Sequence, residues 1–282
     1  MLLTVIGSKA QTNIQEMYDY NRGHFTTTLE MFKADNWGST FFFTDIYHKF
    51  EPSTPTDFYT EIARSLNFWQ NSALGALSLH VEWNGGCGIF DLGAYDTWGG
   101  YPVKNAWLFG IEYFLHNSDF SNTFTFELLY KRFSGQKAMD NRPAQVGIIN
   151  AVYPFFNVSD IPIQFTFVWG MQNLFGVKGL VFSGFLDVWG ENICWNYNER
   201  NLEDISMAKA LNIESNVMWD NTKIVILSEP QIWYNVGQHF GCENLFVGGE
   251  VELAYNFTGG CGLPNGNKGF TYAPCLGIKW AF

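Results

Sequence analysis

The sequence predicts an all-β fold: a single transmembrane antiparallel β-barrel of about twelve strands, with short periplasmic turns and long extracellular loops. Three observations predict it. Runs of about ten residues alternate between apolar and polar or small side chains, which puts one kind on each face of a strand. Aromatic residues make up 18% of the chain and charged residues only 15%. No stretch approaches the roughly 20 apolar residues that a membrane-spanning helix requires.

Turn signals separate the expected strands. The twelve strands are expected at 13–20, 24–34, 38–48, 58–68, 76–84, 104–115, 122–133, 161–174, 179–190, 223–236, 245–257 and 269–282. An even count returns the chain to the side from which it started. Counting Ala144–Phe155 and Lys209–Trp219 as strands gives fourteen, but this forces the long segment 191–208 onto the turn side, so twelve is preferred.

The connections between these strands differ in length. The short ones are expected on the periplasmic side, at 34–37, 69–75, 116–121 and 175–178. The long stretches are expected outside the cell, at 85–103, 134–160 and 191–222. This asymmetry is typical of outer-membrane barrels.

The carboxyl-terminal strand has the clearest alternation. Its large apolar residues occupy every second position from Phe270 to Phe282. Such a row would be an aggregation hazard in water, but it is the outer wall of a barrel in lipid. The ending resembles the closing strand of bacterial outer-membrane barrels, in which a terminal Phe is the usual assembly signal. We therefore expect a bacterial outer-membrane location, contact with its lipid, and recognition of Phe282 by the barrel-assembly machinery.

The amino-terminal residues 1–10 are expected to be the remnant of an export signal peptide, so the barrel domain comprises 11–282. Residues Leu2 to Ile6 are apolar, and small residues precede Gln11 at the positions that a signal peptidase needs. The basic region is missing, and the alternative is a frayed first strand.

Charge and cysteine content exclude some functions. The net charge is −11, which argues against a nucleic-acid partner because phosphate binding needs a basic surface. The five cysteines show no CxxC or Cys/His metal spacing and are expected mostly in loops. No cofactor or metal site is expected from the sequence.

The polar face of each strand is expected to line the barrel interior, where carboxylates outnumber the inward bases Lys131 and Lys279. The inward acids are Glu82, Glu112, Glu127, Asp187, Glu229, Glu250 and Glu252. An acid-lined pore concentrates cations. The alternative is that these acids pair with bases and hydroxyls in a closed interior. Arg64 shares the outward parity, which a bulge or an interfacial position would explain.

The strand 38–48 has aromatic residues on both faces. If Asp45 points inward, Phe41 and Phe43 do so too. Inward aromatic rings beside acids can stack a flat ring and hydrogen-bond its sugar, and stacking of one base contributes roughly 1–3 kcal/mol. The alternative is that these rings fill the interior of a narrow barrel.

A family resemblance is found in the same region. The segment from Leu29 to Trp37, running into Phe41, Phe43 and Asp45, resembles the second and third strands of the Tsx-like nucleoside-specific channel-forming outer-membrane family. Glu61-Ile62 and the run 179–190 are similar to later strands of that family, and the likeness covers a third of the chain. It implies a monomeric twelve-stranded barrel that passes nucleosides by diffusion, with Glu30 and Glu61 in the lumen. Residues 134–160 and 191–222 look longer than in the family, so loop-borne gating does not carry over.

The function expected from the sequence is an outer-membrane channel for passive diffusion of small solutes, with nucleosides as substrates. The alternatives are a general small-solute or cation-preferring porin and a structural or adhesive barrel. An enzyme is less favoured. Only His80, two residues from Glu82 and on the same face, suggests a general base, and no recognisable nucleophile lies beside it in the sequence.

Overall fold

The structure, a computed structural model, describes residues 11–48, 56–70, 72–91, 98–133, 162–191, 194–196, 217–219, 223–257 and 269–282. Its strands are β1 (Gln11–Asp19), β2 (His24–Asp35), β3 (Gly38–His48), β4 (Asp57–Leu66), β5 (Leu77–Asp91), β6 (Trp98–His116), β7 (Asn122–Phe133), β8 (Ile163–Gln172), β9 (Leu180–Glu191), β10 (Cys194–Asn196), β11 (Val217–Trp219), β12 (Lys223–Ser228), β13 (Gln231–Asn235), β14 (Leu245–Tyr255) and β15 (Phe270–Ala281). Two short 3₁₀ turns accompany them, η1 (Leu174–Gly176) and η4 (Gly237–His239). Within these ranges no helix has the length and apolar character needed to span a membrane.

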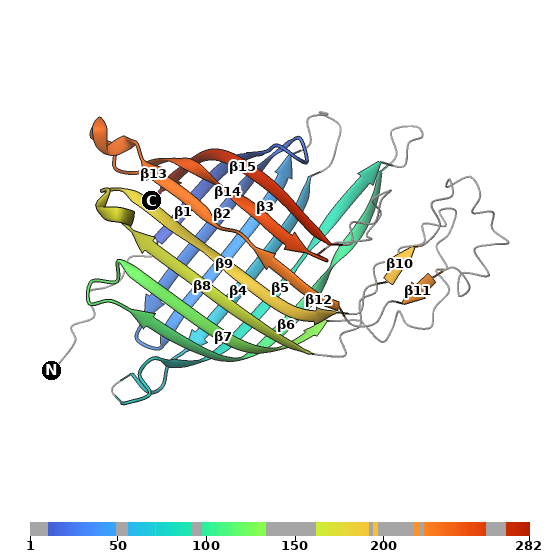
Figure 1. Ribbon diagram of the computed structural model, residues 1–282, viewed down its shortest axis with the longest axis horizontal. Helices are drawn as coiled ribbons and strands as arrows, with labels where there is room; N and C mark the ends of the chain where they lie inside the picture. Colours follow the sequence, from blue (N-terminus) through green and yellow to red (C-terminus); the bar gives the residue numbers. More distant parts are fainter. Residues whose placement is uncertain are drawn as a thin grey trace.

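The strands form a closed antiparallel barrel (Figure 1). Each strand from β1 to β9 pairs with its neighbour in the chain, and β15 pairs with both β14 and β1, which closes the ring. β12 and β13 both lie between β9 and β14, so they are two halves of one barrel strand. The barrel therefore has twelve strands, and the predicted count is confirmed.

The predicted strand 223–236 is interrupted at Glu229 and Pro230, because proline has no N–H to donate to a ladder. The wall stays closed there by other bonds. The Glu229 N–H donates to the Phe185 carbonyl over 3.2 Å, and the Pro230 carbonyl accepts from Val251 N–H over 3.1 Å. Opposite the break, Gly184 has φ +153°, and a Cβ at this position would lie 2.4 Å from the Glu229 carbonyl oxygen.

The connections predicted to be periplasmic gather at the end of the barrel where the chain terminates, and the four-residue turn between β1 and β2 lies at the opposite end (Figure 1). The end where the chain terminates carries the two-residue turn Asn36–Trp37 and the turns that contain η1 and η4. The expected loop 85–103 is wrong, because β5 continues to Asp91 and β6 already begins at Trp98. Backbone pairing across these two strands continues through a register shift between Asn84 and Gly86.

The two extra strands of the fourteen-strand count are not part of the described barrel. Ala144–Phe155 lies outside the described residues. Of Lys209–Trp219 only Val217–Trp219 is described, and it pairs with β10 in a separate two-stranded sheet. Residues 1–10, all of 134–160 and most of 191–222 also lie outside the described residues.

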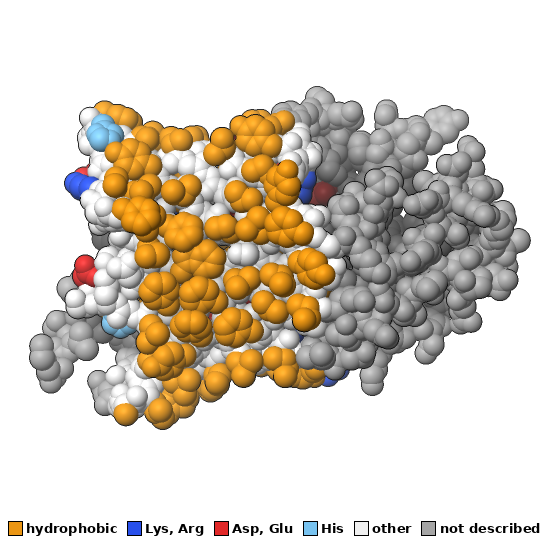
Figure 2. Space-filling view, in the orientation of Figure 1, with side chains coloured by type: hydrophobic (Ala, Val, Ile, Leu, Met, Phe, Trp, Pro, Cys, Tyr) orange, Lys and Arg blue, Asp and Glu red, His pale blue; other side chains and the backbone are white. Residues whose placement is uncertain are grey.

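The outer wall carries a broad band of apolar side chains, with charged groups confined to the two ends on the face seen in Figure 2. The closing strand shows why. Leu276 and Ile278 are 59% and 53% exposed, whereas Ala273 and Cys275, on the other parity, are only 5% and 8% exposed. The predicted alternation is therefore confirmed. Cys275 lies in a strand, as do Cys87 in β5 and Cys194 in β10, so the expectation that the cysteines are mostly in loops is wrong.

Arg64 faces outward, as its parity predicted, and it lies near the short-turn end of β4. Its guanidinium donates two hydrogen bonds of 2.8 Å to the Asp35 carboxylate and one of 2.9 Å to the Thr40 hydroxyl. The outward position of this arginine is therefore balanced by a bidentate ion pair at the rim, which favours the interfacial explanation over a bulge.

Candidate functional site in the barrel interior

The inward face of the sheet is polar and largely buried. Buried side chains on this face include Ser78, His80 and Thr166, whereas Leu79 next to them in sequence is 44% exposed on the outer face. The register between strands places the residues predicted for the lumen on this inward face: Glu30, Phe41, Phe43, Asp45, Glu61, Glu82, Glu112, Glu127, Asp187, Glu250 and Glu252. Glu229, the remaining one, lies in the break between β12 and β13.

A row of aromatic rings follows the inner wall of β3 and β4. The ring centroids of Phe41 and Phe43 are 6.0 Å apart, and those of Phe43 and Tyr59 are also 6.0 Å apart. In the strand register, Phe43 lies between Glu30 on β2 and Glu61 on β4. All five side chains are partly exposed. The structure thus brings together the predicted rings and acids, and it adds Tyr59, which the sequence analysis missed.

The acids beside this row have fixed hydrogen-bond donors. The Tyr59 hydroxyl donates to Glu61 Oε1 over 2.6 Å. Thr28 Oγ1 donates to Asp45 Oδ1 over 2.5 Å, and Asn13 Nδ2 donates to Glu30 Oε1 over 2.8 Å. Each of these carboxyl groups is therefore held in place by a donor that carries no positive charge.

Acids from the opposite wall face the same space. Glu229 lies within electrostatic range of Glu250, Asp45 and Glu61, so it experiences repulsion from its own wall and from β3 and β4. Gln231 Nε2 donates to Glu250 Oε2 over 2.8 Å, again a neutral partner. The two walls together present a concentration of negative charge.

One of these interior acids, Glu252, forms an ion pair with a basic side chain. Arg22, in the turn between β1 and β2, donates to both oxygens of Glu252 over 2.6 Å and lies 3.1 Å from Asp19 Oδ2. The sequence analysis missed Arg22 because it lies between two predicted strands, where parity says nothing about direction. The predicted inward lysines are confirmed: the Lys279 ammonium lies 4.2 Å above the Trp233 ring, and the Lys131 side chain is buried.

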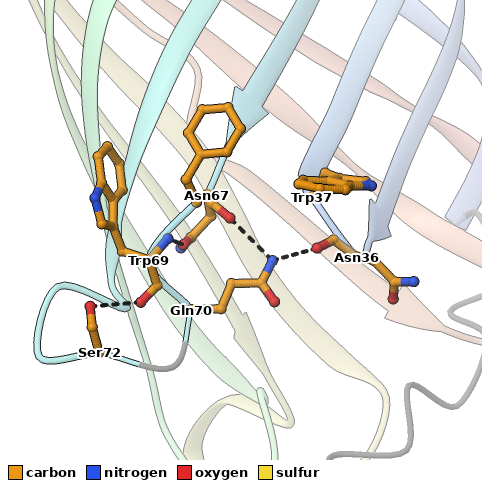
Figure 3. Close-up of a pocket in the computed structure, with 7 residues that line it drawn as sticks. Asn36, Trp37, Asn67, Trp69, Gln70 and Ser72 are labelled. Atoms are coloured by element: carbon orange, nitrogen blue, oxygen red, sulfur yellow. Dashed lines mark hydrogen bonds between the residues drawn. The ribbon is translucent and has the colours of Figure 1, made fainter.

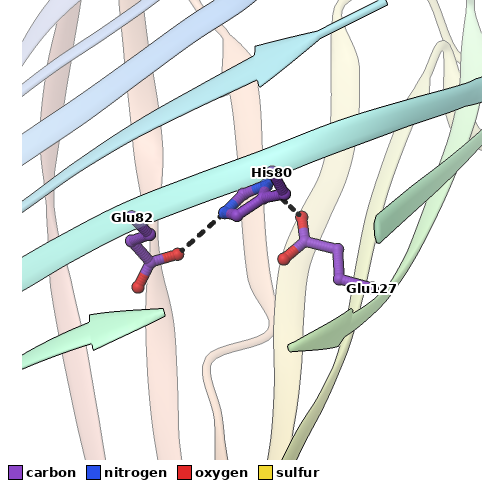
Figure 4. A group of neighbouring side chains, drawn as sticks. All are labelled: His80, Glu82 and Glu127. Atoms are coloured by element: carbon purple, nitrogen blue, oxygen red, sulfur yellow. Dashed lines mark hydrogen bonds and ion pairs between the residues drawn. The ribbon is translucent and has the colours of Figure 1, made fainter. Parts of the chain in front are cut away.

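A second cluster surrounds His80 on the inner wall of β5 to β7. His80 Nε2 lies 3.3 Å from Glu82 Oε2, and its Nδ1 lies 3.3 Å from Glu112 Oε2 and 3.8 Å from Glu127 Oε1. Figure 4 shows the imidazole between the carboxylates of Glu82 and Glu127. Strand pairing explains the group, since Glu112 and Glu127 are direct neighbours across β6 and β7.

The comparisons with known proteins place this barrel in a family. The model of a family described as "Domain of unknown function (DUF5020)" matches residues 12–282. The chain belongs to the DUF5020 family. No curated protein matches it. The match extends from β1 to β15, so the DUF5020 domain includes both interior clusters. The family description names no activity, and the resemblance to the nucleoside channels remains a prediction.

The predicted general base of the DUF5020 barrel has a hydroxyl near it that the sequence analysis did not find. Ser65 Oγ lies 3.4 Å from His80 Nδ1, but it donates its hydrogen bond to Glu112 Oε2. Ser65 is also only 5% exposed. A nucleophile must present its oxygen to both a base and a substrate, and the hydroxyl of Ser65 is buried in the barrel wall with its hydrogen bond donated to Glu112.

A pocket of about 410 Å³ lies outside the interior clusters of the DUF5020 barrel, at its short-turn end. It is formed by the β2–β3 turn and the β4–β5 connection (Figure 3). Gln70 Nε2 donates to the Asn36 carbonyl over 2.7 Å and to the Asn67 carbonyl over 3.3 Å, which ties the two turns together. The exposed rings of Trp37 and Phe68 beside it lie where aromatic girdles occur in membrane barrels.

Proposed function

We propose that this DUF5020 protein is an outer-membrane channel for the passive diffusion of small solutes, and that nucleosides are its substrates. The observation that carries the proposal is the inward row of Phe41, Phe43 and Tyr59, flanked by the carboxylates of Glu30 and Glu61. The proposal agrees with the resemblance to the nucleoside channels, but it is argued from this geometry.

The outer wall supports a location in lipid. Large side chains such as Phe109, Ile111 and Leu128 are 47%, 45% and 53% exposed on the outer face of neighbouring strands. A continuous apolar belt of this kind is an aggregation hazard in water and a favourable surface in a bilayer. We propose that the protein is a monomer in the outer membrane and that the assembly machinery recognises its terminal Phe282.

The exposure of the inward side chains supports a solute path along the wall formed by β3 and β4. The inward side chains of β3 and β4 around Phe43 are partly exposed, whereas Glu112, Glu127 and Thr166 on β6, β7 and β8 are nearly buried. A solute inside the barrel would therefore contact the accessible aromatic row, because the side chains of the opposite polar wall are packed against one another.

The chemistry of this wall suits a nucleoside. A nucleobase is flat and can stack on an aromatic ring, which contributes roughly 1–3 kcal/mol per base. Ribose hydroxyls donate hydrogen bonds, and the carboxyl oxygens of Glu30 and Glu61 can accept them. The interior acids also disfavour phosphorylated analogues, because a negatively charged solute is repelled by an acid-lined passage.

Liposome swelling tests the proposal. The refolded protein is reconstituted, and uptake is compared among nucleosides, nucleotides, and sugars and amino acids of similar size. We expect faster uptake of nucleosides, with saturation at low concentration. Equal rates for nucleosides and matched sugars would instead identify a general porin, for which the excess of interior acids predicts cation preference. Uptake of no solute would identify a structural barrel.

A further inference from the structure

The cluster around His80 brings together nitrogen and oxygen atoms of the kinds that ligate metal ions. The side chains of His80, Glu82, Glu112 and Glu127 are only 4%, 13%, 11% and 8% exposed. Among the described residues, one donor atom from each of His80, Glu82 and Glu127 lies within 4.8 Å of the other two. These three side chains converge from β5 and β7 (Figure 4).

Charge within the cluster is unbalanced. Three carboxylates surround a single imidazole, so ionised acids would leave negative charge even if the imidazole were protonated. Burial of charge without a counterion is costly.

Glu127 provides a second, independent observation. This side chain is more than nine-tenths buried, and the contact that the structure gives its carboxylate is an ion pair with His80. Its contact is with His80 Nδ1, at 3.8 Å. This contact is longer than a hydrogen bond, so the buried carboxylate keeps acceptor capacity for a cation.

We infer that His80, Glu82 and Glu127 bind a divalent first-row transition-metal ion, such as Zn²⁺, inside the barrel wall. Imidazole with carboxylates is a donor set that suits this class of ion. Ligands about 2.1 Å from a tetrahedral ion lie roughly 3.4 Å apart, and His80 Nε2 lies 3.3 Å from Glu82 Oε2. The donor atoms of all three residues lie within 4.8 Å of one another, so the site closes when the flexible side chain of Glu127 moves toward the ion.

The surroundings orient these ligands. Glu112 lies 3.3 Å from His80 Nδ1, and a hydrogen bond there orients the ring so that Nε2 faces Glu82. Ser65 donates to Glu112, and Asn84 Nδ2 donates to Glu82 Oε1 over 3.4 Å. A carboxylate behind a ligating histidine is the usual second-shell arrangement of a metal site. Glu112 is therefore a positioning residue, and the inference does not depend on the proposed transport function.

Zinc binding to the refolded barrel tests the inference. The protein in detergent is stripped with a chelator, and Zn²⁺ binding is measured by calorimetry and elemental analysis. We expect one tightly bound Zn²⁺ per chain, and histidine-dependent absorption bands when Co²⁺ replaces it. The isosteric variant Glu127→Gln should weaken binding at least 10-fold, in line with the effect of altering a metal site. The matched control Glu250→Gln, an inward acid held by Gln231, should bind like the wild type.

A heat-modifiable band on gels shows which variants are folded. If Glu127→Gln does not fold, Glu112→Gln should still fold and bind Zn²⁺ roughly 10- to 100-fold more weakly. Absence of stoichiometric Zn²⁺ in the wild-type barrel would overturn the inference. Equal losses in the folded cluster variant and in Glu250→Gln would also overturn it, because the ion would then bind the interior acids in general.

Discussion

Removal of the aromatic row should slow nucleosides selectively. The change is Phe41→Ala together with Phe43→Ala, which leaves Tyr59 as the only ring of the row. The three rings follow one another at centroid distances of 6.0 Å and 6.0 Å. A base therefore stacks on one ring at a time, and the expected loss is that of one stacking contact rather than two.

One stacking contact contributes roughly 1–3 kcal/mol. Since about 1.4 kcal/mol is a factor of ten, the concentration that half-saturates nucleoside flux should rise roughly 5- to 140-fold. The flux of a sugar of equal size should stay the same or increase, because the sugar loses no stacking partner and the passage widens.

The assay is uptake by liposomes over a range of substrate concentrations, with a nucleoside and a sugar measured in parallel. Phe109→Ala is the matched control, because it removes an exposed phenyl ring from the outer face and leaves the interior intact. Loss of saturation for the nucleoside alone is the expected result. If both solutes accelerate alike, the row is only an obstruction, and the nucleoside proposal is refuted.

Three further predictions concern charge, assembly and packing. Glu250→Gln with Glu252→Gln should lower the preference for cations over anions, more at low salt than at high because salt screens the acids; an unchanged reversal potential at low salt would contradict this. Deletion of Phe282 should reduce membrane insertion more than transport per inserted barrel, and wild-type insertion in cells would show that this residue is no assembly signal. Gly184→Ala should reduce the yield of heat-modifiable barrel, because the new methyl group would lie 2.4 Å from the Glu229 carbonyl oxygen; wild-type yield would contradict it.

The barrel and its two faces could be predicted from the sequence because both depend on a local pattern of period two. The closing strand is an example, since each outward residue from Phe270 onward is followed by an inward one. The extension of β5 to Asp91 could not be predicted this way. Gly85 and Gly86 carry no pattern and look like a turn, but backbone pairing to β6 continues past them.

The candidate site was predictable only as separate residues. Parity placed His80, Glu112 and Glu127 inside, but their contact depends on the register of three strands, which parity does not specify. The same limit applies to Tyr59, which joins the aromatic row only through its pairing with Asp45. The acids were found because charge in a strand interior is conspicuous, whereas hydroxyls such as that of Ser65 are not.

The first and last barrel strands meet along a seam. The Phe282 N–H donates to the Thr12 carbonyl over 2.8 Å, so the two chain ends of the barrel adjoin at one rim. A short linker from Phe282 to Gln11 would turn this seam into an ordinary hairpin. New termini could then be opened in the turn 117–121, at the same end, without loss of any strand pairing. Such a circular permutant should form the same barrel. Its first and last strands would be β7 and β6, so the pairing of these two strands, instead of that of β1 and β15, would have the largest loop-closure entropy cost.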